Sequence, residues 1–142
     1  MSPSPFVLDT SVLVHAVRRD RVWQRIQAEY KLFLVAPTPL ICVVSVRELR
    51  SLSLYREWGP AKREQMNFVL GSFAVADINH PDAISSYAAI DSHFQRQGRS
   101  LGKNDLWIAA ITAALGGHLL TCDRDFDDLD TRFLSRTWID PS

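Results

Sequence analysis

The sequence of 142 residues has little of what marks several large classes of protein. Its two cysteines, Cys42 and Cys122, have no metal-site spacing, and each lies in an apolar run. We therefore expect buried free thiols in a reducing compartment, the cytoplasm, and no disulfide framework. No apolar run is long enough to span a membrane, so we expect no membrane association. Residues 1–5 lack a basic region and a long apolar one, so we expect no signal peptide.

The chain also lacks net charge, because sixteen basic residues balance sixteen acidic ones. The bulk charge predicts no nucleic-acid partner, but such a sum conceals a local basic patch beside an acidic site. Four arginines between residues 18 and 25 could contact phosphates or simply form a solvated helix face. A Gly-x-Ser-x-Gly elbow and a phosphate-binding Gly-Lys-Ser/Thr loop are both missing from the sequence.

Short apolar segments alternate with helical patterns along the chain. We expect strands at 6–8, about 40–44, 73–76, 118–122 and 136–139. We expect helices at 12–16, 20–32, from 45 through 54, 60–70, 81–94 and from 103 to 115. This alternation predicts a single α/β domain over residues 1–142, a three-layer α/β/α sandwich with a central, mostly parallel sheet.

One stretch of the sequence combines a buried helix with an acid. From Leu106 to Leu115 every residue except Thr112 is apolar, which predicts a helix in the core of the domain. The glycine pair 116–117 predicts its end. Its first turn nevertheless carries Asp105, and the apolar strand that follows ends at a second acid, Asp123.

Two further acids occupy equivalent places. Asp9 follows the first strand, and Glu48 lies early in the helix after the second strand. In a parallel sheet the carboxyl ends of the strands and the starts of the following helices share one edge, where ligands bind. We therefore expect Asp9, Glu48, Asp105 and Asp123 to converge at that edge.

Each acid also has a purely structural explanation. Asp9 could form an Asx-turn, and Thr10–Ser11 could cap the first helix. Glu48 could complete a capping box with Ser45, Asp105 could cap its helix or oppose the helix dipole, and Asp123 could lie in a solvated turn. Together, however, crowded carboxylates repel unless a cation lies between them. Mg²⁺ and Mn²⁺ take oxygen ligands, and such ions activate water for phosphoryl-ester cleavage.

The sequence resembles the PIN-domain ribonucleases, most closely the VapC-type toxins of bacterial toxin–antitoxin modules. The matching segments are Leu8–Ser11, Glu48–Leu49, Asn104–Ala110 and Thr121–Phe126, and the resemblance covers nearly the whole chain. It implies that Asp9, Glu48 and Asp105 are metal-site acids, with Asp123 or Asp125 as the fourth. We favour Asp123, because it directly ends the strand. The resemblance also implies that the hydroxyl of Thr10 or Ser11 supports the metal site.

This resemblance implies a Mg²⁺- or Mn²⁺-dependent endoribonuclease that hydrolyses RNA phosphodiesters by in-line attack of water. It also implies a homodimer and a cognate antitoxin, which often inserts an arginine into the acidic pocket. The apolar residues between Leu49 and Trp58 are candidates for an interface, although core packing explains part of them. The alternatives are an inactive or housekeeping PIN-like RNA-binding module and a haloacid-dehalogenase-like phosphatase. Such a phosphatase needs a second aspartate two residues after Asp9, where Ser11 stands.

Overall fold

The computed structural model describes residues 3–142, so Met1 and Ser2, in the stretch expected to contain no signal peptide, lie outside the described residues. Within that range five strands form one sheet, in the order β3-β2-β1-β4-β5, and all neighbouring strands are parallel. The strands are β1 (Phe6–Leu8), β2 (Leu40–Cys42), β3 (Ala74–Ala76), β4 (His118–Thr121) and β5 (Ser135–Trp138). The helices are α1 (Thr10–Arg18), α2 (Arg21–Tyr30), α3 (Val43–Tyr55), α4 (Pro60–Ser72), α5 (Pro81–Arg96), α6 (Lys103–Ala114) and the 3₁₀ helix η1 (Arg124–Leu129).

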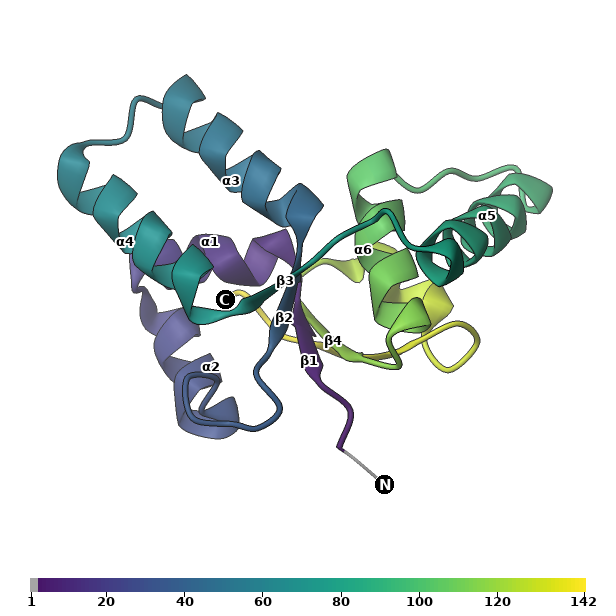
Figure 1. The fold of residues 1–142 in the computed structure, drawn as a ribbon, viewed down its shortest axis with the longest axis horizontal. Helices are drawn as coiled ribbons and strands as arrows, with labels where there is room; N and C mark the ends of the chain where they lie inside the picture. The colour runs from purple at the N-terminus through teal and green to yellow at the C-terminus, as the bar shows by residue number, and fades with distance from the viewer. Residues whose placement is uncertain (1–2) are drawn as a thin grey trace.

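Two layers of helices cover the two faces of the sheet, with α1–α4 on one side and α5 and α6 on the other (Figure 1). Successive residues of a strand point to opposite faces. Leu8 and Leu120 therefore pack in the core under α1–α4, whereas Val7 and Leu119 pack in the core under α5 and α6. The predicted three-layer α/β/α sandwich is confirmed, and its sheet is parallel throughout.

The order of the strands places β1 at the centre of the sheet. The chain runs from β1 outward to β2 and β3, then returns through α5 and α6 to β4 on the other side of β1. Ligands in open α/β sheets bind beyond the carboxyl ends of the strands at such a switch point. Here the two strand ends are also joined directly, because the N–H of Asp9 donates to the carbonyl oxygen of Leu120 at 3.0 Å.

The predicted core helix is α6, and its end follows the predicted glycine signal. Gly116 has a φ of +61°, the left-handed conformation that favours glycine at helix ends. Gly117 donates its N–H to the carbonyl oxygen of Thr112 at 2.9 Å. A Cβ on Gly117 would lie 2.7 Å from Cγ2 of Val7, so any larger residue there would force Val7 in β1 to shift.

The sequence-based expectations for the end of β2 and the start of α3 are wrong. The second strand ends at Cys42 instead of Val44, and α3 begins at Val43 instead of Ser45. Val44 packs into the core under α6, and this burial outweighs the preference of valine for strands. Ser45 is buried inside the helix, so it forms no capping box with Glu48.

Thr10 and Ser11 do not cap α1 either. They are its first two residues, and Asp9 occupies the N-cap position without a capping hydrogen bond from its side chain. Their hydroxyl groups are therefore available for other contacts, which lie at the edge where the acids meet.

No helix in the stretch from residue 3 to residue 142 is both long and apolar enough to cross a membrane.

Candidate metal centre

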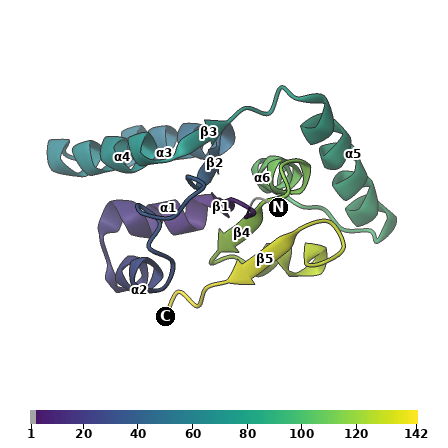
Figure 2. The same cartoon turned by 60° about the horizontal axis from the view of Figure 1, so that its bottom comes forward.

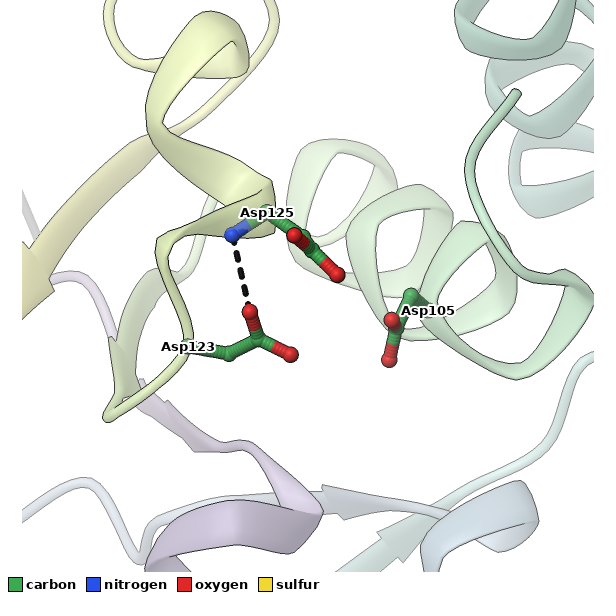
Figure 3. A group of neighbouring side chains, drawn as sticks. All are labelled: Asp105, Asp123 and Asp125. Carbon is green, nitrogen blue, oxygen red and sulfur yellow. Dashed lines mark hydrogen bonds between the residues drawn. The ribbon is translucent and has the colours of Figure 1, made fainter. Parts of the chain in front are cut away.

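Three carboxylates lie together at the carboxyl edge of the sheet. Asp105 comes from the first turn of α6, Asp123 from the residue before η1, and Asp125 from the second residue of η1. One carboxylate oxygen of each lies within 4.8 Å of one oxygen of each of the others. Figure 3 shows Asp125 and one oxygen of Asp123 directed toward Asp105. Since hard divalent cations bind oxygen at about 2.0–2.6 Å, a single ion can reach all three.

The turn after β4 positions two of these acids. Asp123 Oδ1 accepts the backbone N–H of Asp125 at 2.8 Å (Figure 3), and the backbone N–H of Asp123 donates to Oγ1 of Thr121 at 2.9 Å. One oxygen of Asp123 thus has a structural role as the N-cap of η1, which differs from the solvated turn considered for it. The other oxygen is directed into the cluster, and Asp125 lies beside it. The structure therefore brings both candidates for the fourth acid to the same place.

Asp9 is only 3% exposed and is held by two hydroxyl groups. Ser11 Oγ donates to its Oδ2 at 2.6 Å, and Thr121 Oγ1 donates to the same oxygen at 2.8 Å. Each hydroxyl also accepts a backbone N–H from the turn after β4: Ser11 from Cys122 at 3.0 Å and Thr121 from Asp123 at 2.9 Å. The hydroxyls therefore link the end of β1 to the turn that carries Asp123.

Glu48 is held by the hydroxyl group of Thr10, the first residue of α1. Thr10 Oγ1 lies 2.9 Å from Oε1 of Glu48 and 2.8 Å from Oγ of Ser45. A carboxylate can only accept, so Thr10 donates to Glu48 and accepts from Ser45. Thr10 thus supports Glu48, whereas Ser11 supports Asp9. The sequence did not identify Ser45 and Thr121 as residues that support the site. Each is a polar residue within an otherwise apolar segment, and this could have indicated such a role.

The electrostatics of Asp105 place all five acids in one group. The pKa of Asp105 is raised to about 7, first by partial burial and then by the carboxylates of Asp9, Asp123, Glu48 and Asp125, in that order. Burial also raises the pKa of Asp9, against the hydrogen bonds from Ser11 and Thr121. Asp9 and Glu48 lie outside the tight group of three, yet are near enough to act on Asp105.

Comparison with known proteins places the chain in a family. Residues 6–132 match the model of the PIN domain. The chain belongs to the PIN-domain family. Among curated proteins, none matches the chain in sequence.

Solved structures have the same PIN fold. VapBC2 from Rickettsia felis, bound to a DNA fragment from its promoter, aligns with a TM-score of 0.79 and 18% identity over 95% of this chain and 98% of that chain. VapBC-5 from Mycobacterium tuberculosis, a member of the VapBC family of toxin–antitoxin systems, aligns with a TM-score of 0.67 and 28% identity over 96% and 98%. FitAcB from Neisseria gonorrhoeae aligns with a TM-score of 0.72 and 20% identity over 92% and 95%.

The donors at the edge of this PIN domain fit a hard divalent cation. The clustered ligand atoms are all carboxylate oxygens, which Mg²⁺ and Mn²⁺ accept. Partial burial and the neighbouring carboxylates both raise the pKa of Asp105, and a cation among these acids would favour its charged form. Asp105 does not cap α6, because Gly102 occupies the N-cap position. Interaction with the helix dipole remains as its structural explanation.

The pKa of Asp105 predicts how the metal-free PIN domain responds to pH. Because this pKa rises from 3.8 to about 7 on folding, the folded state binds more protons between these values, and stability falls as the pH rises through this window. In chelator, we expect Asp105→Asn to match wild type near the low end of the window and to be more stable than wild type above pH 7. Melting curves at both ends test this. An Asn variant whose advantage grows as the pH falls would contradict it.

Proposed function

We propose that this PIN domain is a Mg²⁺- or Mn²⁺-dependent endoribonuclease and the toxin of a type II toxin–antitoxin pair. The observation that carries the proposal is the convergence of Asp105, Asp123 and Asp125 within the reach of one cation. Asp9 and Glu48 stand near enough to raise the pKa of Asp105. An acidic site that serves only for structure would not need five carboxylates, since their mutual repulsion opposes folding.

In this proposal Asp105, Asp123 and Asp125 hold the metal, and Asp9 and Glu48 complete its acidic surroundings. When bound, a divalent cation activates water and neutralises charge on the phosphodiester. Ser11 and Thr121 keep the buried Asp9 oriented by donating to one of its oxygens. These hydrogen bonds favour the charged form of the carboxylate and so oppose the rise in the pKa of Asp9, although burial has the larger effect.

The direct test is RNA cleavage by purified protein. We expect a mixture of structured and single-stranded RNAs to be cut with Mg²⁺ or Mn²⁺ and to remain intact with chelator. An Asp9→Asn/Asp105→Asn double variant, purified in parallel, controls for contaminating nucleases. Equal cleavage by wild type and the double variant would reject the proposal, as would cleavage that does not depend on metal.

The alternative functions have less support. A haloacid-dehalogenase-like phosphatase would need an aspartate at position 11, but Ser11 stands there and its hydroxyl donates to Asp9. An inactive RNA-binding module would not need to retain every acid of the cluster. Such a module would bind RNA without cutting it in the cleavage test.

We also propose a cognate antitoxin as the partner, since the similar solved structures include members of toxin–antitoxin systems. The acidic cluster would accept an arginine of such a partner. Purification with the genomic neighbour co-expressed, followed by size analysis, tests the partnership.

We propose the cytoplasm as the location of the protein. Cys42 and Cys122 are both free, and burial raises the pKa of each thiol to about 11, which agrees with a reducing compartment. Cys122 is only partly buried, however, and not fully buried as expected.

A homodimer is proposed as well, with the end of α3 as its candidate surface. Of the apolar residues considered there, Leu49 is fully buried in the core, but Leu54 and Tyr55 are 74% and 86% exposed. This exposed pair is the best candidate for an interface, because Leu52 and Trp58 are partly buried. Equilibrium sedimentation of wild type and Tyr55→Glu tests the assignment, and a variant that self-associates like wild type would reject it.

We propose finally that residues 1–142 form a single PIN domain.

A further inference from the structure

A substrate such as RNA meets unfavourable charge at this site. Five carboxylates lie at the edge of the sheet, and the RNA backbone carries a negative charge at every phosphate. Bound cations offset only part of this repulsion. The phosphates on either side of the cleaved bond therefore need positively charged side chains at the rim of the cluster.

The arginines first considered for this role, in α1 and α2, are partly engaged elsewhere. Arg19 donates to the side chain of Gln65, and Arg25 Nη2 donates to the carbonyl oxygen of Asp140 at 2.6 Å. Arg124 is better placed, because it lies between two cluster acids in the chain, and its side chain is 60% exposed.

Contacts on two sides hold the guanidinium of Arg124. It lies over the ring of Trp138, 3.5 Å from the ring centroid, and its Nη1 donates to Oδ2 of Asp127 at 3.3 Å. Asp127 has a second cationic partner besides Arg124, because Nη2 of the partly buried Arg136 lies 3.2 Å from its Oδ1. A guanidinium has five N–H donors, so a stacked Arg124 retains donors along its edge for a planar anion such as phosphate.

Trp138 is itself fixed to the turn that carries the acids. It ends β5 and pairs in register with Thr121 of β4. Figure 2 shows these two strands side by side. Its Nε1 donates to the carbonyl oxygen of Cys122 at 3.1 Å. The indole ring of Trp138 therefore has a fixed position. The residue to which it donates, Cys122, immediately precedes Asp123 in the chain.

We propose that Arg124 binds a phosphate of single-stranded RNA next to the one that is cleaved, and that Trp138 is a positioning residue that holds its guanidinium against the turn that carries Asp123 and Asp125. This inference rests on the proposed ribonuclease function. It adds a substrate contact and a reason for the stacked Arg124–Trp138 pair.

The test is RNA binding in an Asp105→Asn background, in which cleavage is stopped. A short fluorescent single-stranded RNA is titrated with protein at several salt concentrations, with chelator present so that any residual cleavage by Asp105→Asn is prevented. Arg124→Gln is expected to bind about tenfold more weakly, the loss of one charge-assisted hydrogen bond. The slope of log affinity against log salt should fall by about 0.7, as for one phosphate contact on a single strand. The matched control is Arg63→Gln, which removes the same charge from exposed α4 and should leave the slope unchanged.

Trp138 is tested by a double-mutant cycle. Trp138→Leu should weaken binding, but should add little when Arg124 is already Gln, because both changes remove the same contact. Arg124→Lys keeps the charge and should retain the salt slope while losing part of the affinity. Melting curves identify any variant that fails to fold, and Arg124→Lys then carries the comparison.

Three results would overturn the inference. The first is an Arg124→Gln variant with the affinity and slope of Arg63→Gln. The second is equal loss of binding in the Gln and Lys variants with no change of slope. In both cases the proposed function is still supported if wild type cleaves RNA with Mn²⁺. The third is RNA that is neither cleaved by wild type nor bound in the background variant, which rejects both proposals.

Discussion

Asp105→Asn is expected to reduce RNA cleavage by more than about a hundredfold, the upper end of what loss of an outer-shell partner costs a metal site. The reason is that Asp105 shares a cluster with Asp123 and Asp125, in which each carboxylate offers an oxygen to the same small volume. An amide is neutral and a poorer ligand for a hard cation. The measurement is the initial rate of cleavage with saturating Mn²⁺.

The matched control for this change is Asp82→Asn. Asp82 is also an acid in the first turn of a helix, but it is exposed at the start of α5 and lies outside the cluster. It should retain the cleavage rate of wild type. If both variants lost activity equally, the effect would come from helix starts in general and the metal centre would lose its central residue.

The same substitution should act in cells. We expect expression of wild type without a partner to slow growth, and expression of Asp105→Asn at the same level to leave growth unaffected. Unimpaired growth with soluble, well-expressed wild type would favour a housekeeping or inactive PIN domain over a toxin.

The second large effect is stabilisation by metal. Wild type should gain roughly 2.7 kcal/mol of unfolding free energy when Mn²⁺ stands about a hundredfold above its dissociation constant. Asp105→Asn should lose most of this gain. Removing one of several repelling carboxylates should cost the metal-free protein little, since Asp105 is not the N-cap of α6.

Melting curves of wild type, Asp105→Asn and Asp105→Ala, each with chelator and with Mn²⁺, measure these effects. If Asp105 supported only its helix, by its interaction with the helix dipole, Ala would lower stability by roughly 0.3–1 kcal/mol with or without metal. Wild type that does not respond to Mn²⁺, together with a clearly weaker Ala variant, would therefore reject the metal site. The pH experiment on the same variants gives an independent check, because it needs no metal.

Much of this architecture was predictable because its signals are local. Local sequence patterns predict the individual helices and strands: the apolar run of α6, the glycines after it and the short apolar strands. The alternation of strands and helices then predicts a parallel sheet. Parallel strands share a carboxyl edge, so acids at strand ends and helix starts could be expected to meet. The other four expected acids do lie close enough to Asp105 to influence its pKa.

The start of α3 was not predictable in the same way. The apolar run 40–46 is rich in β-branched residues, and nothing local shows that the strand stops at Cys42. The helix begins early because Val44 finds a place in the core under α6, far away in the sequence. A local capping pattern at Ser45 and Glu48 was therefore misleading, and both side chains instead meet Thr10.

The sequence by itself determined the fold class and the set of acids at the edge of the sheet, since both follow from local pattern and the rules of parallel topology. Only the tertiary structure decided how these acids are arranged. It placed Asp105, Asp123 and Asp125 within reach of one ion and connected Asp9 to Thr121, which is 112 positions away. Distances of this kind depend on how β1, β4 and the turn after β4 pack together, and no local pattern contains that information.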